Sequence, residues 1–138
     1  MSARPIPPNS PLTEPYWEAA RRGELTTQVC RACDLRIFPP RANCPGCGDA
    51  SLRWAPVSGR GTLYSFTVAR RAPHPVFAGQ LPLVVAIVEL EEGPRMITNL
   101  VELEEADLEV GVAVVVRFEP IDDSDVVLPV FTPARETD

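Results

Sequence analysis

Four cysteines, arranged as two C-x-x-C pairs, constrain most strongly what this chain can fold into. They lie in the segment CRACDLRIFPPRANCPGC, where ten residues separate the two pairs. Each pair can wrap a tight turn around a metal ion, and two facing turns supply four thiolates in the tetrahedral arrangement that zinc prefers. We therefore predict one structural Zn²⁺ held by Cys30, Cys33, Cys44 and Cys47.

Two other uses of these cysteines stay open. The turn Cys44-Pro45-Gly46-Cys47-Gly48 also resembles a rubredoxin knuckle, so iron is an alternative to zinc. Its proline fixes φ, and its glycines suit positions that need positive φ. Two disulfides are the second alternative, but such frameworks are typical of small secreted chains. The N-terminus, MSARPIPPNSPLTEP, lacks the apolar stretch of a secretory signal, and we expect a cytoplasmic protein with reduced thiols.

Length and charge limit the remaining possibilities. A chain of 138 residues allows one ordinary domain or two very small ones. A formal net charge of −6 makes it a poor general binder of nucleic-acid phosphates. No apolar run approaches the roughly 20 residues of a membrane-spanning helix, so no membrane contact is expected.

The first part of the chain is predicted to be an arm and short helix over residues 1–24, followed by a zinc ribbon over residues 25–58. Prolines keep the arm extended, and Thr13 and Gly23 are suitable ends for the helix. The ribbon strands are expected at residues 25–29, 36–38 and 52–57. Because the ribbon contains few apolar residues, the metal should supply much of its folding free energy.

Residues 59–138 read as a second, all-β unit. Strands are expected at residues 62–68, 83–90, 96–101, 112–118 and 126–131, with one helical turn within 103–110. Alternation places Tyr64, Phe66 and Val68 on one face, and Pro129 marks the last strand as an edge strand. Five strands with this helical element predict a five-stranded OB-fold barrel, so the fold class is mostly β. An open five-stranded sheet is the alternative.

Two of these strands are apolar on both faces, at residues 84–88 and 112–116. A barrel strand in water needs only one apolar face. The sequence does not indicate which face points inward. Either the ribbon and helix or another subunit must cover the outer face, and we expect a protein partner.

The chain offers few groups for catalysis. Its one histidine, His74, lies in the segment Ala-Pro-His-Pro, and all four cysteines are assigned to the metal. A site with four cysteine ligands leaves no position for water or substrate. We therefore expect a protein that is not an enzyme.

Taken together, these features resemble the zinc-ribbon and OB-fold family once catalogued as a domain of unknown function and described as acyl-CoA-associated. The matching features are the helix with Tyr16 and Trp17, the cysteine ribbon enclosing Phe38-Pro39-Pro40-Arg41, the motif Ser58-Gly59-Arg60-Gly61-Thr62, and Gly111-Val112. The resemblance implies an accessory partner of a thiolase-superfamily enzyme, such as a thiolase, ketoacyl synthase or lipid-transfer-type aldolase. It further implies a role in acyl-CoA handling or complex assembly.

A candidate acyl-CoA site follows from the densest cations near the barrel. Charge-assisted contacts from Arg60, Arg70 and Arg71 would meet CoA phosphates, with His74 and Phe77 in the adjoining loop. Arginines that are simply solvent-exposed are the alternative.

Two rival functions are a free-standing OB-fold nucleic-acid binder and, with iron, an electron carrier. Acidity argues against the first, as does the lack of an aromatic and basic groove.

Overall fold

The computed structural model describes residues 7, 9–71, 75, 79, 82–122 and 124–134. It begins with one helix, α1 (Glu14–Arg21), at the predicted place. Thr13 takes the N-cap position, but its hydroxyl donates to Asn9 Oδ1 (3.0 Å) and caps no helix N–H. Gly23 follows the helix with φ 79°, a conformation that glycine adopts without strain. Among the described residues, no helix is long and apolar enough to cross a membrane.

The ribbon is a three-stranded antiparallel sheet in the order β2-β1-β3. Its strands are β1 (Thr26–Cys30), β2 (Arg36–Ile37) and β3 (Leu52–Pro56). The central strand is buried along its whole length although most of its residues are polar. The side-chain amide of Gln28 forms two hydrogen bonds with the backbone of Arg41: its oxygen accepts from Arg41 N–H (2.8 Å) and its nitrogen donates to Arg41 O (3.0 Å). This pair of bonds fixes the loop between β2 and the second cysteine pair.

The second unit is a closed five-stranded barrel in the order β4-β5-β6-β8-β7. Its elements are β4 (Arg60–Ala69), β5 (Leu83–Leu90), β6 (Arg95–Leu100), the 3-10 helix η2 (Glu105–Asp107), β7 (Ala113–Pro120) and β8 (Val127–Pro133). The pairs are antiparallel except β6–β8, which is parallel. This is the predicted OB-fold, and the open sheet is rejected.

The prediction that Pro129 marks an edge strand is wrong. β8 lies between β6 and β7, and Pro129 is buried opposite Phe118. The barrel tolerates a proline here because β8 pairs with β6 further along, at Phe131. At Pro129 itself the contact with β6 is a side-chain hydrogen bond, in which the Thr98 hydroxyl donates to the Pro129 carbonyl (3.3 Å). This contact does not use the backbone N–H that proline lacks.

The prediction that Tyr64, Phe66 and Val68 share a face is also wrong for Tyr64. The pairing of β4 with β5 shifts register between Leu63 and Ser65, which is a β-bulge. Phe66 and Val68 therefore pack on the core, whereas Tyr64 turns outward and is 46% exposed. The bulge is invisible in the sequence because simple alternation assumes an unbroken ladder.

The structure also identifies the inner faces of the two strands that are apolar on both sides. Val84 of β5 and Val114 of β7 point into the barrel and are buried, whereas their neighbours Val85 and Val115 are half-buried on the outside. Each strand therefore contributes one face to the core and a second apolar face to the barrel surface.

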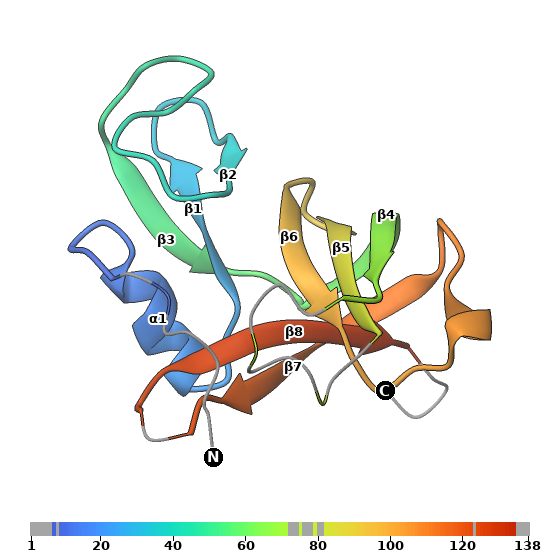
Figure 1. Ribbon diagram of the computed structural model, residues 1–138. Helices are drawn as coiled ribbons and strands as arrows, with labels where there is room; N and C mark the ends of the chain where they lie inside the picture. The colour runs from blue at the N-terminus through green and yellow to red at the C-terminus, as the bar shows by residue number, and fades with distance from the viewer. Residues whose placement is uncertain are drawn as a thin grey trace.

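Helix α1 joins the two units. It contacts β1 of the ribbon and β8 of the barrel (Figure 1). The Tyr16 ring packs against Phe38 at 5.6 Å and against Trp54 at 6.5 Å between ring centroids, and it belongs to the same core cluster as the barrel residues. The cysteine-bearing end of the ribbon projects away from the barrel (Figure 1).

Candidate metal centre

The two cysteine turns have the same backbone geometry. In the first, Asp34 N–H donates to Cys30 O at 2.9 Å; in the second, Gly48 N–H donates to Cys44 O at 2.9 Å. The residue after each pair adopts positive φ, 63° at Asp34 and 81° at Gly48. Glycine adopts this conformation freely, and aspartate is one of the few other residues that tolerate it. The sequence predicted this role for Gly48 but not for Asp34.

These turns bring all four sulfurs together. The Sγ atoms lie within 4.8 Å of one another, with Cys30–Cys47 and Cys33–Cys44 both at 3.6 Å. Four sulfurs around zinc at about 2.3 Å are about 3.8 Å apart at the edges of a tetrahedron. The four thiols are free, so the two-disulfide alternative does not describe this site. The arrangement fits one tetrahedral metal ion.

Backbone N–H groups stabilise the thiolate form of Cys44. The N–H groups of Cys47 and Gly46 lower the pKa of the Cys44 thiol to about 7. The Gly46 contact to Cys44 Sγ measures 3.3 Å. A thiol with this pKa is substantially deprotonated at neutral pH, which is the form that binds metal. With four protein ligands the centre is closed to substrate, so it is structural.

The structure does not bring the candidate acyl-CoA arginines into one cluster. Arg60 is the first residue of the ten-residue strand β4 and Arg70 follows its last residue, and a strand of that length spans roughly 30 Å. Arg70 forms a bidentate pair with Glu105 (2.9 and 3.1 Å), whose hydrogen bonds and charge lower the pKa of the Glu105 carboxyl. Arg71 is exposed. The candidates His74 and Phe77 lie outside the described residues, and the acyl-CoA site stays a prediction.

Sequence reasoning missed a hollow beside the barrel. It is lined by side chains from α1, the ribbon loop and the barrel strands β5, β6 and β8, including Tyr16, Phe38 and Met96. Tyr16 and Phe38 drew attention only as features of the resemblance, and no sequence signal linked them to β6. Their convergence is a product of the tertiary structure.

Two family descriptions match the chain over adjoining segments. "ChsH2, rubredoxin-like zinc ribbon domain" matches residues 17–53, and "ChsH2, C-terminal OB-fold domain" matches residues 54–119. These matches agree with the observed ribbon and barrel.

Curated relatives fall into two groups. A "Probable enoyl-CoA hydratase alpha subunit" of Thermomonospora curvata is 41% identical over 119 residues, covering 86% of this chain and 36% of that protein. The chain therefore spans about a third of the length of this relative. A "DUF35 domain-containing scaffold protein" of Methanothermobacter thermautotrophicus is 35% identical over 102 residues, covering 73% of this chain and 76% of that protein.

Among solved structures, a chain titled "Ltp2-ChsH2(DUF35) aldolase" superimposes with a TM-score of 0.85 at 38% identity. The match covers 94% of this chain and 100% of that chain. Helix, ribbon and barrel are thus all shared with this structure.

Proposed function

Because the chain belongs to the ChsH2/DUF35 family of zinc-ribbon and OB-fold proteins, we propose that it is a non-catalytic accessory subunit of a thiolase-superfamily enzyme. It supports acyl-CoA handling or assembly of the complex, with its zinc ion in a structural role. Its site of action is the cytoplasm, where free thiols are maintained. The partner is a thiolase or a lipid-transfer-type aldolase.

One observation carries this proposal. The full length of a chain from the Ltp2-ChsH2(DUF35) aldolase matches 94% of this chain at 38% identity. A match of that extent includes the helix, the ribbon and the barrel together. The description of the Methanothermobacter relative as a scaffold protein supports the same role.

The chemistry of the described residues supports a non-catalytic role. The metal centre has four cysteine ligands, which leaves no coordination position for water or substrate. The names of some relatives include hydratase or aldolase, but the chain spans only 36% of the hydratase subunit that it matches. We assign the chemistry to the partner enzyme. The Arg70 charge is already paired with Glu105, which weakens its attraction for a CoA phosphate.

The outer face of β7 provides the test. Val115 is half-buried on this face, whereas its neighbour Val114 is 1% exposed inside the barrel. Val115→Asp should leave the monomer folded and weaken the complex, because a charge is costly in a buried interface. Val114→Asp is the matched control and should unfold the barrel, since it buries an unpaired charge in the core.

The measurement is co-expression with candidate thiolase-superfamily enzymes of the native host, followed by size-exclusion chromatography. A stable complex with the unmodified chain, lost in the folded Val115→Asp variant, is the expected result. A well-behaved monomer that associates with none of these enzymes contradicts the proposal.

A further inference from the structure

Strand β6 has an open edge on the side that faces β8. The two strands pair at one position only, Leu100 with Phe131, where Val101 N–H donates to Phe131 O (2.9 Å). From there toward Arg95, β6 has no further ladder partner in β8 among the described residues. Pro129 explains the interruption, because it lies two residues before Phe131, on the same side of β8, and lacks the N–H that would continue a ladder. Over most of its length β6 is therefore paired only with β5.

The register of β5 and β6 shows which backbone groups of β6 point to this edge. In the hairpin that joins the two strands, Leu90 N–H donates to Pro94 O (2.9 Å). Because hydrogen-bonded pairs alternate along an antiparallel ladder, Met96 and Thr98 bond to β5, whereas the N–H and C=O of Ile97 point away from it. Ile97 is 72% exposed, and no hydrogen bond of its backbone is found within the described part of the chain. Proteins normally protect an edge of this kind, with unpaired backbone groups and an exposed apolar residue.

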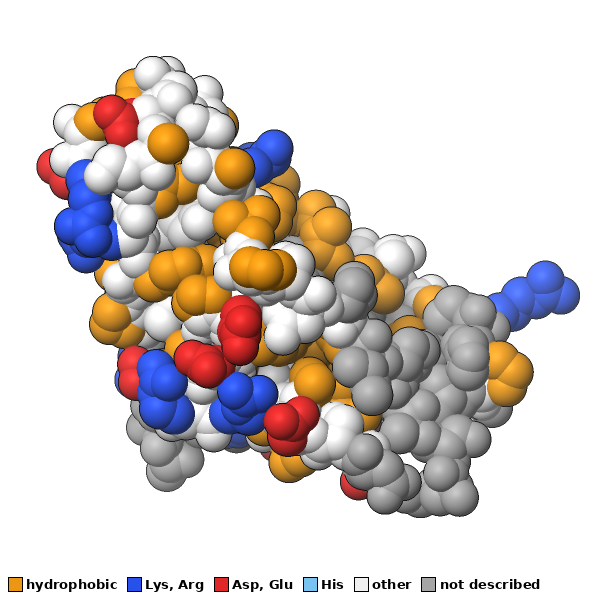
Figure 2. Space-filling view, turned by 90° about the vertical axis from the view of Figure 1, so that its left-hand side faces the viewer, with side chains coloured by type: hydrophobic (Ala, Val, Ile, Leu, Met, Phe, Trp, Pro, Cys, Tyr) orange, Lys and Arg blue, Asp and Glu red, His pale blue; other side chains and the backbone are white. Residues whose placement is uncertain are grey.

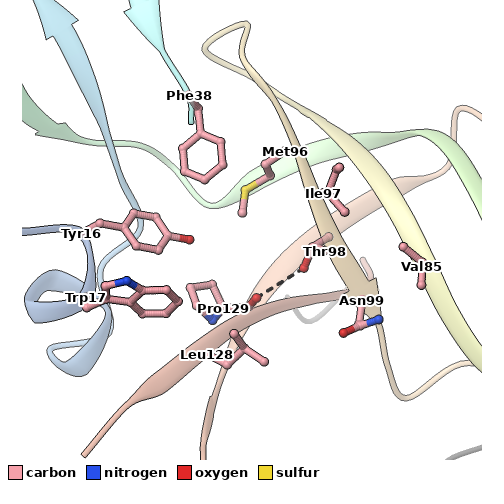
Figure 3. A pocket seen from close by; sticks show the side chains of 10 residues that line it. All are labelled: Tyr16, Trp17, Phe38, Val85, Met96, Ile97, Thr98, Asn99, Leu128 and Pro129. Carbon is pink, nitrogen blue, oxygen red and sulfur yellow. Dashed lines mark hydrogen bonds between the residues drawn. The ribbon is translucent and has the colours of Figure 1, made fainter. Parts of the chain in front are cut away.

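Two hollows follow this strand, and we call them together the β6 groove. The first, of about 430 Å³, is lined by β6 from residue 96 to residue 99, and the second, of about 390 Å³, from residue 95 to residue 97. Tyr16 and Trp17 of α1 and Phe38 of the ribbon loop form the opposite wall of the first hollow (Figure 3). Hydrophobic side chains also gather on the surface below the ribbon, near its junction with the rest of the molecule (Figure 2). The groove thus combines an apolar wall with the polar backbone edge of β6.

Arg95 gives one end of the β6 groove a positive charge. Among the described residues that line the two hollows, it is the only charged one, although the formal net charge of the chain is −6. Its guanidinium lies 3.8 Å from the centre of the Tyr64 ring and forms an ion pair with Glu89 (2.9 Å). Both partners of this ion pair are about half exposed, and a guanidinium has five N–H donors, so Arg95 can bind a second carboxylate.

We propose that the β6 groove binds an extended segment of another protein, which adds to β6 as an antiparallel strand. Its backbone pairs with Ile97, because an added strand supplies both the N–H and the C=O that this edge lacks. Residues of the segment opposite Thr98 and Met96 share the face of these side chains, meet the apolar wall and are apolar. The residue opposite Arg95 is acidic, since residues directly opposite in a ladder interact. In chain order the segment therefore reads apolar, any residue, apolar, acidic.

A second copy of this chain matches the edge less well. Antiparallel pairing of two β6 strands about Ile97 would place Arg95 opposite the neutral Asn99 and leave its charge without a partner in the other copy. The inference goes beyond the proposed function, because it requires no particular class of enzyme. Failure of a peptide to bind would leave the accessory-subunit role standing.

Hydrogen exchange tests the open edge in the zinc-loaded full chain. The Ile97 amide should exchange at least roughly tenfold faster than the amides of Met96 and Thr98, which bond to β5. Equal protection of the three amides would show that the edge is covered and overturns the proposal. Protection of Ile97 that depends on protein concentration would assign the edge to a second copy. Protection lost on deletion of residues 1–8 would assign it to the N-terminal arm, and either result contradicts a foreign segment.

The peptide acetyl-Ser-Thr-Leu-Val-Leu-Glu-Ser-amide tests the added strand, with its Val opposite Ile97 and its Glu opposite Arg95. Binding should shift the Ile97 amide signal and slow its exchange. Methylation of the Val nitrogen removes the N–H that pairs with Ile97 and should weaken binding roughly tenfold or more. Methylation of the second Leu nitrogen is the matched control and should change affinity little, because that N–H points away from β6. Absence of binding, or equal weakening by the two methyl groups, overturns the proposal.

Charge at the end of the groove provides an independent test of the register. Lys in place of the peptide Glu should weaken binding roughly fivefold, because it lies opposite Arg95. Arg95→Gln should abolish this difference between the two peptides. Val110→Asp, at a 62% exposed position that lines neither hollow, is the control and should preserve it. A difference that persists in the Arg95→Gln variant contradicts the proposed register.

Discussion

At the residue scale, the glycines of the Ser58-Gly59-Arg60-Gly61 motif are explained by close packing at the entrance to the barrel. Gly59 has φ +80°, and a Cβ there would lie 2.6 Å from Val116 Cγ1. A Cβ on Gly61 would lie 2.5 Å from the backbone oxygen of Glu89 on the neighbouring strand. Both positions therefore need glycine for steric reasons, and the motif has a structural role in closing the barrel.

Gly61→Ala should accordingly destabilise the barrel by about 2 kcal/mol or more, because the backbone at Glu89 cannot move away without breaking the β4–β5 pairing. Thr62→Ala, at the exposed neighbouring position, is the control and should change stability by about 0.5 kcal/mol or less. Urea denaturation followed by fluorescence measures both values. Equal stability of the two variants would show that the close approach at Gly61 is easily relieved.

At the element scale, the ribbon has very little core of its own. Its separate buried cluster consists of Cys30, Ile37 and Cys44, with Leu52 packed against it. The strand ends nearer the barrel instead join the large cluster that contains Tyr16 and Leu25. The cysteine-bearing end is therefore held mainly by its metal, whereas the barrel end of the ribbon is held by apolar packing.

Removal of the metal should disorder the cysteine-bearing end of the ribbon and leave the barrel folded. Elemental analysis should find one zinc ion per chain. Chelation, or Cys33→Ser, should broaden or shift the NMR signals of β2 and both cysteine turns while those of Val88 and Phe131 in the barrel persist. Arg31→Ser, at an exposed position inside the first pair, is the matched control and should retain zinc. Iron in the purified protein would contradict the zinc assignment.

At the scale of the whole molecule, the negative net charge disfavours nucleic-acid binding by the OB-fold. The formal net charge is −6, and each described exposed ion pair joins an arginine to a carboxylate, as between Arg70 and Glu105. The acidic surface agrees with a role in protein assembly and disfavours binding to a phosphate backbone.

The expected outcome of a gel-shift assay is therefore negative. At about 20 mM salt, where electrostatic attraction is strongest, the zinc-loaded chain should retard neither single-stranded DNA nor RNA. A basic OB-fold protein run alongside serves as the positive control. Retardation that weakens steeply with added salt would favour the nucleic-acid-binding alternative.

The sequence by itself determined the features that depend on short-range spacing. Two C-x-x-C pairs separated by ten residues predict a four-thiolate site from local spacing alone, because all four ligands lie within one short segment. The positions of helix α1 and the strands likewise follow from local signals such as Gly23 and the period-two alternation. The family resemblance also rests on such local motifs, and the matches to the ribbon and OB-fold family descriptions confirm it.

Only the tertiary structure decided what depends on contacts between distant segments. It closed the barrel around Pro129, turned Tyr64 outward through a bulge and placed Val84 inside and Val85 outside. Each of these outcomes reflects strand register, and a shift of one residue exchanges the two faces of a strand. The hollow beside Tyr16 is of the same kind, because its walls come from a helix, a ribbon loop and three barrel strands that meet only in the folded chain.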